Sequence, residues 1–482
     1  MQPLVILRIV GLLLMLYSTT VIPAILISIY YADGALMPFV DTLLLSISCG
    51  LFLWFPVRRQ KNDLKLRDGF IVVVLFWLGL GLVGSLPLYI GSFGLSFSDA
   101  LFESMSGLTT TGATIFTQLE DLPKSVLYYR QQLQWLGGMG IIVLAVAILP
   151  MLGIGGMQLY RAETPGPVKD NKLTPRITQT AKALWFIYFG LTVTCALAYW
   201  LAGMSLFDAI GHSFSTVAIG GFSTHDASIG YFNSTTIEMI AGFFMLVSGI
   251  NFALHFSALR ENSLRPYFFD VEFKVYLSIL TIVSIICVVY LYFSNTYPHW
   301  SDALHHGIFQ TISIGTTTGF TTAAYYNWPG FLPVMLLFIS FIGGCAGSTG
   351  GGMKVIRFIL LFKQGLREIF RLVHPNAQIP IKVGNKVMAD KVTNAIWGFF
   401  ALYVASFSFM MLALMATGLD QVTAFSALAA SLNNLGPGLG SVGENYSSIN
   451  DLSKWILSFA MLLGRLEIFT LLVLFTPAFW RR

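Results

Sequence analysis

Two short polar phrases are nearly identical in an otherwise apolar chain: LTTTGAT at 108–114 and GTTTGFT at 315–321. Each contains three threonines followed by a glycine, and each lies between long apolar runs. Backbone carbonyls and hydroxyls can replace the hydration shell of an alkali cation. Glycine accepts the positive φ that turns successive carbonyls to one side. The two phrases therefore predict oxygen-lined sites for a dehydrated cation.

Two further segments occupy the same place in a repeated pattern. The four stretches read FSDALFESMSGLTTTGAT, LFDAIGHSFSTVAIGGFS, WSDALHHGIFQTISIGTTTGFT and LDQVTAFSALAASLNNLGPG. Each has an Asp near its start, as a helix cap would, and a helical part of only about three turns. Such a helix is too short to cross a membrane, so each stretch should enter and return on one side. Aligning the glycines gives the candidate ligands Thr110, Thr111, Gly112; Ala218, Ile219, Gly220; Thr317, Thr318, Gly319; Asn434, Leu435, Gly436.

Composition places these stretches in a membrane. The chain has 482 residues, of which 55% are hydrophobic and 11% charged. A soluble protein of this length carries far more charge. Apolar runs of twenty or more residues recur, and the first, at about 4–30, is expected to be a retained helix rather than a cleaved signal. The four cysteines show no CxxC spacing, so neither a metal site nor a disulfide framework is predicted.

The fold class that follows is an all-α polytopic membrane protein with ten transmembrane helices. Two N-terminal helices precede four pseudo-symmetric helix–pore loop–helix repeats. The expected divisions are 1–68 for the N-terminal pair, then 69–160, 181–258, 271–363 (with an intramembrane loop at 343–354) and 389–482 for the repeats. Non-helical backbone at membrane depth must face protein or water. The four loops are therefore expected to surround one central pore.

The positions of Lys and Arg predict the orientation in the membrane. Basic clusters lie at 58–67, 161–182, 260–274, 354–391 and 481–482. The connections at 31–36, 93–123, 204–232, 294–328 and 418–450 contain no Lys or Arg. Because basic loops stay cytoplasmic, both termini are expected inside. The outer connections carry acids such as Asp99, Glu103 and Glu120, which are expected to concentrate cations at the mouth.

The stretch FIGGCAGSTGGGMKVIR at 341–357 interrupts an apolar segment. Its glycine run ends in Lys354 but lacks the spacing of a phosphate-binding loop, so no nucleotide site is predicted. Two interpretations remain: a flexible kink with close helix packing, or a gate lying across the pore. The candidate gate residues are Gly343, Gly344, Ala346, Gly347, Ser348, Thr349, Gly350, Gly351, Gly352 and Lys354, together with Arg465. Arg465 is included because an ionised group within an apolar helix is a functional candidate.

The whole chain resembles the Trk/Ktr/HKT superfamily of cation transporters, and most closely its bacterial TrkH-type potassium-uptake proteins. The resemblance rests on the four loops, the two extra helices, GGCAGSTGGGMKVIR and GRLEIFT. It implies a homodimer with one pore per subunit in the bacterial cytoplasmic (inner) membrane. It further implies K⁺ as the principal ion, with Rb⁺ and Na⁺ as further candidate substrates, and a cytosolic TrkA-type ring protein that binds NAD, ATP or ADP. It also favours a pore-facing Arg465 over a structural pair with Glu467 or backbone carbonyls.

The expected function is potassium uptake through a gated, channel-like pore. A cation entering the cell gains about 2.3 kcal/mol per 100 mV, which corresponds to roughly fiftyfold accumulation. No separate energy source is then required. K⁺ is the transported ion, and neither a bound nucleotide nor a nucleic acid partner is expected. The alternatives are symport with H⁺ or Na⁺, or a non-conducting sensor subunit. An enzyme is not expected, because no set of ionisable groups has catalytic spacing.

Overall fold

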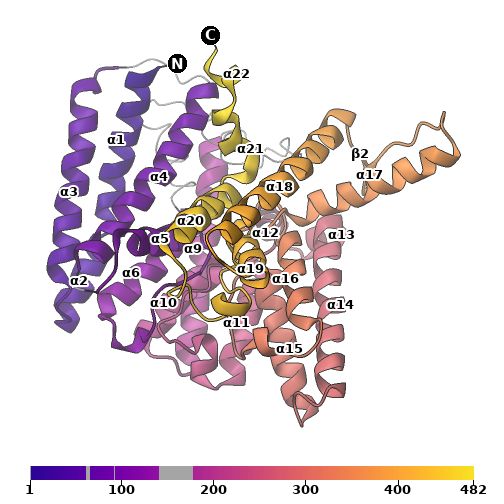
Figure 1. The fold of residues 1–482 in the computed structure, drawn as a ribbon, viewed down its shortest axis with the longest axis horizontal. Coiled ribbons are helices and arrows are strands. Elements are labelled where there is room, and N and C mark those ends of the chain that lie inside the picture. The colour runs from indigo at the N-terminus through magenta and orange to yellow at the C-terminus, as the bar shows by residue number, and fades with distance from the viewer. Residues whose placement is uncertain (1, 61–65, 92, 141–176, 482) are drawn as a thin grey trace.

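The computed structural model describes residues 2–60, 66–91, 93–140 and 177–481, and its elements are almost all helices (Figure 1). Six described helical spans are long and apolar enough to cross a membrane: Pro3–Tyr31, Leu36–Val57, Arg67–Ile90, Lys182–Leu201, Val271–Phe293 and Val392–Ala416. Two further helix pairs are apolar but bent, by 93° at 235–261 and by 108° at 451–475. The strands of the described residues are the two-residue β1 (Lys382–Val383) and β2 (Lys386–Val387), which pair antiparallel. A helical, multi-span membrane fold is confirmed.

The N-terminal pair packs through glycine. The first span comprises α1 (Pro3–Thr19) and α2 (Ile22–Tyr31), and α3 (Leu36–Trp54) returns alongside it. A Cβ atom added to Gly11 would lie 2.8 Å from the Gly50 carbonyl oxygen, and one added to Gly50 would lie 2.9 Å from that of Gly11. Small residues let membrane helices approach this closely. The two predicted N-terminal helices are both present.

The four repeated stretches each begin with a short helix. These are α5 (Phe97–Leu108), α10 (Leu206–Val217), α15 (Trp300–Gly315) and α19 (Gln421–Leu432). Three have 12 residues, as expected, but α15 has 16, so the expectation of three turns is wrong there. Ser96, Ser205 and Asp420 cap α5, α10 and α19 with their side chains. The N-cap of α15 is His299, which makes no such bond.

Each short helix packs against the long helix that precedes it. The long helices are α4 (Leu66–Ile90), α9 (Ile177–Leu201), α14 (Val271–Phe293) and α18 (Asp390–Ala416). The helices that follow are α6 (Lys124–Trp135), α11 (Thr235–Ser248) with α12 (Phe252–Glu261), α16 (Leu332–Ile342) and α20 (Asp451–Arg465). The short helices lie between these two sets and are largely buried. Their C-terminal ends are thereby held inside the protein.

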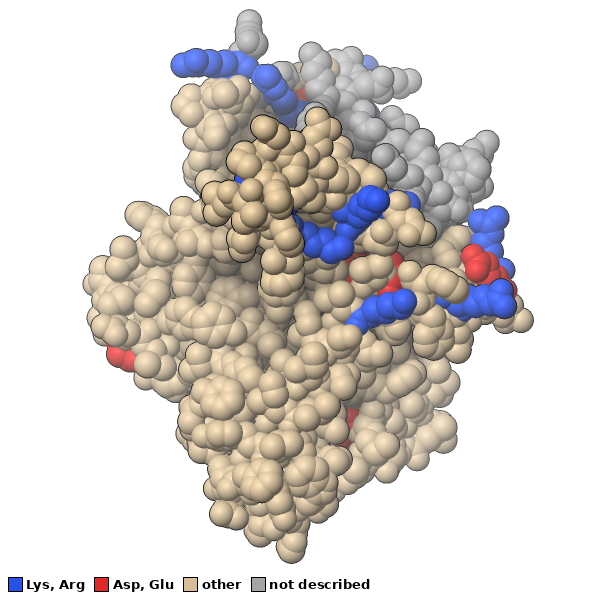
Figure 2. Space-filling model, turned by 90° about the vertical axis from the view of Figure 1, so that its right-hand side faces the viewer, with Lys and Arg blue, Asp and Glu red and all other residues tan. Residues whose placement is uncertain are grey.

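Four further α-helices complete the described fold. They are α13 (Arg265–Phe269), α17 (Val355–Val373), α21 (Glu467–Leu472) and α22 (Pro477–Trp480). Of these, α21 and α22 lie toward the end with the chain termini (Figure 1). Figure 1 shows α17 projecting from the body, and both chain termini lie at the top of the view. In Figure 2, Lys and Arg lie from the top of the molecule, the end with the termini, down to about mid-height, and the lowest third of this face shows none. The basic residues expected at 161–176 lie outside the described residues.

Candidate functional site

The four loops after the short helices share one backbone pattern. In each loop a residue with left-handed φ is followed, two positions later, by a glycine with left-handed φ. The first residues are Thr110 (56°), Ile219 (55°), Thr317 (69°) and Asn434 (54°); the glycines are Gly112 (82°), Gly221 (78°), Gly319 (85°) and Gly436 (97°). The N–H between them bonds to a carbonyl five residues back: Thr111 to Ser106 and Gly220 to Ser215 (both 2.8 Å), Thr318 to Ser313 and Leu435 to Ala430 (both 2.7 Å). Four different sequences therefore adopt one local conformation.

This pattern corrects the alignment of the second loop. The sequence alignment put Gly220 at the position of the shared glycine, but Gly221 has the left-handed φ and Gly220 does not. Ile219 then corresponds to Thr110, while Ala218 caps α10 in right-handed conformation. The error arose because two consecutive glycines fit the motif equally well by residue type. Backbone conformation decides between them.

The glycines also show how the loops meet. A Cβ added to Gly112 would lie 2.1 Å from the Gly220 oxygen of the second loop. A Cβ added to Gly221 would lie 2.1 Å from the Thr318 oxygen of the third loop, and one added to Gly319 would lie 2.2 Å from the Leu435 oxygen of the fourth loop. A Cβ added to Gly436 would lie 2.6 Å from the Thr111 oxygen of the first loop. Each glycine thus lies against the carbonyl of the residue that precedes the corresponding glycine in the next loop, and the glycine of the fourth loop lies against the first loop. The loops form a closed ring that has no room for side chains at the glycines.

Side chains behind the ring bond to several of its carbonyls. The Tyr446 hydroxyl donates to the Gly436 oxygen (2.7 Å), and the Ser313 hydroxyl donates to the Phe320 oxygen (2.7 Å). The Gln134 amide donates to the Gly220 oxygen (2.6 Å). Among the described residues, no hydrogen bond is made to the carbonyl oxygens of Thr111, Thr318 and Leu435. Those three carbonyls can therefore face a cation.

A buried ion pair joins the first two loops, and the sequence analysis missed it. Arg130 on α6 lies 2.7 Å from Glu103 on α5, and both side chains are almost fully buried. Arg130 also donates to the Ser223 carbonyl (3.2 Å) and to the Thr114 hydroxyl (2.9 Å). Glu103 was expected to be an acid of the outer mouth, and that expectation is wrong. The signal was available, because Arg130 is a lone basic residue in YYRQQLQWLGG.

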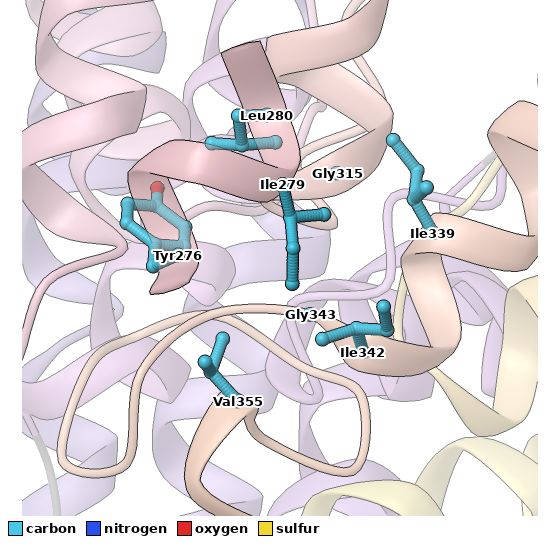
Figure 3. A pocket seen from close by; sticks show the side chains of 8 residues that line it. All are labelled: Tyr276, Ile279, Leu280, Gly315, Ile339, Ile342, Gly343 and Val355. Atoms are coloured by element: carbon cyan, nitrogen blue, oxygen red, sulfur yellow. The ribbon is translucent and has the colours of Figure 1, made fainter. Parts of the chain in front are cut away.

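The helix break predicted at the glycine run is present. The chain leaves α16 at Ile342, crosses as an irregular loop, and enters α17 at Val355 beside Tyr276 of α14 (Figure 3). We call residues 343–354 the intramembrane loop. Its glycines permit tight turns, with φ of 69° at Gly343 and 73° at Gly347 and at Gly352.

The intramembrane loop lies against the inner ends of three short helices. The Thr349 hydroxyl donates to the Val217 carbonyl at the end of α10 (2.9 Å). The Gly351 N–H donates to the Thr317 hydroxyl after α15 (2.6 Å), and the Gly352 N–H donates to the Asn433 carbonyl after α19 (3.0 Å). A Cβ added to Gly351 would lie 2.0 Å from that Asn433 oxygen. Only small residues allow so close a contact.

Arg465, at the end of α20, connects this loop to the first pore loop. Its guanidinium donates to the Thr110 hydroxyl (3.2 Å) and to the Thr349 carbonyl (3.4 Å). It also donates to the carbonyls of Gly138 (2.5 Å) and Gly137, just after α6. The Glu467 carboxylate, expected as a possible partner of Arg465, is ion-paired with Arg357 of α17. The structure therefore brings Arg465 together with both the predicted ligands and the predicted gate.

Two more side chains hold the ends of the intramembrane loop. Glu272 of α14, 8% exposed, accepts from the N–H groups of Ala346 (2.8 Å) and Ile356 (3.0 Å). It thereby joins the start of the loop to the start of α17. The Lys354 ammonium donates to the Gly350 carbonyl within the loop. The sequence analysis had not selected Glu272, because its partners lie more than seventy residues further along the chain.

The acids on the opposite side are partly neutralised. Asp99 is ion-paired with Lys454 at 2.6 Å. In the connection after the second loop, burial and the charge of Glu120 raise the pKa of Asp226. Burial and a hydrogen bond to Glu444 raise the pKa of the Tyr326 hydroxyl to about 12. Because Lys454 offsets the charge of Asp99 and Arg130 offsets that of Glu103, the acidic surplus on this side is smaller than the sequence count suggested.

A multi-span helical protein with a closed ring of backbone carbonyls belongs to the class of membrane transport proteins. The TrkH family, described as cation transport protein, matches residues 35–482. The chain belongs to this family. That membership confirms the resemblance, and it agrees with the expectation that the chain is not an enzyme.

Similar proteins cover its full length. The Trk system potassium uptake protein TrkH of Vibrio parahaemolyticus is 58% identical over 479 residues, 99% of each chain. The protein of the same name from Escherichia coli K12 is 57% identical over 475 residues, 98% of each chain. The crystal structure of the potassium transporter TrkH from Vibrio parahaemolyticus superimposes with a TM-score of 0.91 at 55% identity, covering 100% of both chains.

Proposed function

We propose that this chain takes up potassium across the bacterial cytoplasmic membrane through a channel-like pore. The four helix–loop–helix segments act as pseudo-symmetric repeats, with ten membrane crossings in all and the divisions given above. The observation that carries the proposal is the ring of four equivalent loops with an irregular loop beneath it. The names of the full-length relatives support K⁺ as the ion.

The selectivity filter consists of the three residues that carry the shared backbone pattern in each loop. Its members are Thr110, Thr111, Gly112; Ile219, Gly220, Gly221; Thr317, Thr318, Gly319; Asn434, Leu435, Gly436. Their carbonyls coordinate a dehydrated K⁺ or Rb⁺ in place of water, and Na⁺ less well. Because side chains differ among the loops, discrimination is weaker than in a pore of four identical walls.

The intramembrane loop and Arg465 form a gate in its closed state. Two threonine hydroxyls at the inner end of the filter are engaged, that of Thr110 by Arg465 and that of Thr317 by Gly351. A hydroxyl held this way is less available to an ion leaving the filter. The positive charge of Arg465 also opposes a passing cation, by about 4 kcal/mol at 4 Å for an effective dielectric constant near 20. Opening requires both groups to move from the inner ends of the short helices.

The basic end of the molecule faces the cytoplasm, with both termini inside. Its gathered Lys and Arg side chains (Figure 2) support this orientation. The protein acts as a homodimer and is controlled by a cytosolic TrkA-type ring protein that binds NAD, ATP or ADP. The regulator docks on the basic segment 363–391, which runs from the second half of α17 to the start of α18. Neutralising Lys382, Lys386 and Lys391 together should abolish the regulator response while basal flux persists; regulator binding that survives moves the docking site elsewhere.

Liposome flux tests the function directly. The purified chain should pass K⁺ and Rb⁺ faster than Na⁺ and Li⁺, and its reversal potential should follow the K⁺ gradient alone. Dependence of that potential on H⁺ or Na⁺ indicates symport instead, and absence of any flux, with and without cytosolic extract, indicates a sensor subunit. Deleting part of 346–351 should raise basal flux if the intramembrane loop blocks the pore. Lower flux in a well-folded deletion variant indicates a structural kink.

A further inference from the structure

We propose that Gln134, on α6, is a positioning residue of the second pore loop and replaces the side chain that Gly220 lacks. This inference rests on the proposed function, because it assigns Gln134 a role in the filter. The second loop differs from the others at one ring position. The residue before the left-handed glycine is Thr111, Thr318 or Leu435 in three loops and Gly220 in the second.

The carboxamide of Gln134 fills the space that this glycine leaves. The Gln134 side chain is fully buried. A Cβ added to Gly220 would lie 2.4 Å from its Cδ, 2.5 Å from its Oε1 and 2.8 Å from its Nε2. Because the φ of Gly220 lies outside the left-handed range, its backbone accepts a side chain. The neighbouring carboxamide, and not the backbone conformation, is what excludes one.

The same carboxamide bonds to the peptide groups on both sides of Gly221. Its Nε2 donates to the Gly220 oxygen (2.6 Å), and its Oε1 accepts from the Phe222 N–H (3.0 Å). A carbonyl only accepts and a backbone N–H only donates, so the two bonds fix which end of the amide is which. The filter glycine of the second loop is thus held from outside its own repeat.

The position of the bonded carbonyl makes this contact relevant to ion binding. The Gly220 oxygen is the one that abuts Gly112 of the first loop in the ring. Its counterparts at Thr111, Thr318 and Leu435 accept no hydrogen bond from the described residues. A carbonyl oxygen has two lone pairs, so that of Gly220 can accept from Gln134 and still face a cation. Gln134 therefore sets the direction of one of four ring carbonyls.

A set of variants of the full chain in liposomes tests this role. Gln134→Leu removes both hydrogen bonds of the carboxamide and should lower the K⁺/Na⁺ permeability ratio roughly tenfold, since each net bond changes an equilibrium by up to about a factor of ten. Gln134→Glu keeps the acceptor for Phe222 but loses the donor to Gly220, and should lower the ratio as well. Gly220→Thr should lower it by collision with Gln134. Combining Gly220→Thr with Gln134→Ala should restore most of the ratio, because the threonine then takes the vacated space as in the other loops.

Two controls separate this inference from general effects. Gln132 lies on the same helix, but its amide donates to the Thr20 carbonyl (2.7 Å), away from the ring; Gln132→Leu should leave the ratio unchanged. Gly319→Ser tests the filter itself. If Gly319→Ser changes the ratio and Gln134→Leu does not, the role of Gln134 is rejected and the proposed function stands. If neither variant changes the K⁺/Na⁺ permeability ratio, both the role of Gln134 and the proposed filter are rejected. A well-folded double variant that recovers nothing also overturns the inference.

Discussion

The pore loops and the intramembrane loop are both irregular backbone buried in the protein, but they are held in different ways. Each pore loop makes the same bond to its own short helix, to a carbonyl five residues back, and the second loop is also held by Gln134 of α6. The intramembrane loop has bonds between its two ends, such as Met353 N–H to the Phe341 oxygen (2.9 Å), but it is also bonded to distant elements, including α10, α14 and α20. A loop fixed by local bonds keeps its shape when its neighbours move. A loop fixed by distant partners can be released when any of them shifts, which suits a filter and a gate respectively.

The largest expected effect is on stability, at the Arg130–Glu103 ion pair, where the first two pore loops are held by more than their own short helices. Arg130→Ala leaves Glu103 buried without its ionic partner, which costs about 3–5 kcal/mol of stability. Thermal unfolding in detergent should show a large fall in the melting temperature. Lys454→Ala is the matched control, because its partner Asp99 is 19% exposed and keeps its hydrogen bonds from Ser96. Equal melting temperatures for the two variants would show that the first and second loops are held locally after all.

The ring glycines should affect selectivity more than stability. Gly319→Ser forces a side chain into left-handed φ, at about 1–2 kcal/mol, and places its Cβ 2.2 Å from the Leu435 oxygen. We expect the K⁺/Na⁺ permeability ratio in liposomes to fall more than tenfold. Gly221→Ser should have a similar effect, since its Cβ meets the Thr318 oxygen at 2.1 Å. An unchanged ratio at Gly221 with a reduced one at Gly319 would contradict the register derived from the backbone.

The sequence predicts the pore loops, which bond to their own short helices, better than the contacts of the intramembrane loop with distant elements. Gly112, Gly319 and Gly436 are predicted correctly as the shared glycines because each loop carries its own motif beside its own helix. Gly221 is missed by one residue because glycine doublets are ambiguous without φ. The run of small residues locates the intramembrane loop, since so many glycines in succession disfavour a continuous helix.

The contacts that join distant segments could not be predicted. The bond from Thr349 to Val217 spans 132 residues, and that from Arg465 to Thr110 spans 355. No periodicity in either segment indicates the other. Arg130 is a different case, because a lone charge in an apolar helix is itself a signal. The residues that give a single loop its conformation can therefore be predicted from the sequence, while the hydrogen bonds between loops can be found only from the fold.

The next prediction concerns the charge at the junction of the two regions. Arg465→Ala removes donors to the Thr110 hydroxyl and to the Thr349 carbonyl, and it removes a positive charge that opposes cations. Basal K⁺ flux should rise about tenfold or more, as charge-assisted bonds of about 1.5–3 kcal/mol each are lost. Arg465→Lys should keep most of the barrier because the charge remains. If Arg465 is only structural, its loss lowers stability and flux together, which an expression and melting control detects.

The smallest expected effect tests whether the gate is held from outside. Glu272→Ala removes the acceptor shared by the N–H groups of Ala346 and Ile356, which join the start of the loop to α17. Loosening both ends should raise basal flux a fewfold, since each net hydrogen bond contributes about 0.5–1.5 kcal/mol. Glu272→Gln retains an oxygen at the same place and should leave basal flux near that of the unmodified chain. Ser278→Ala, on the exposed face of the same helix, is the control for general effects on α14. Equal flux in the Ala and Gln variants, with the melting temperature preserved, would show that the intramembrane loop keeps its position without Glu272. The contrast between the intramembrane loop and the filter would then rest on Arg465 and the short-helix contacts alone.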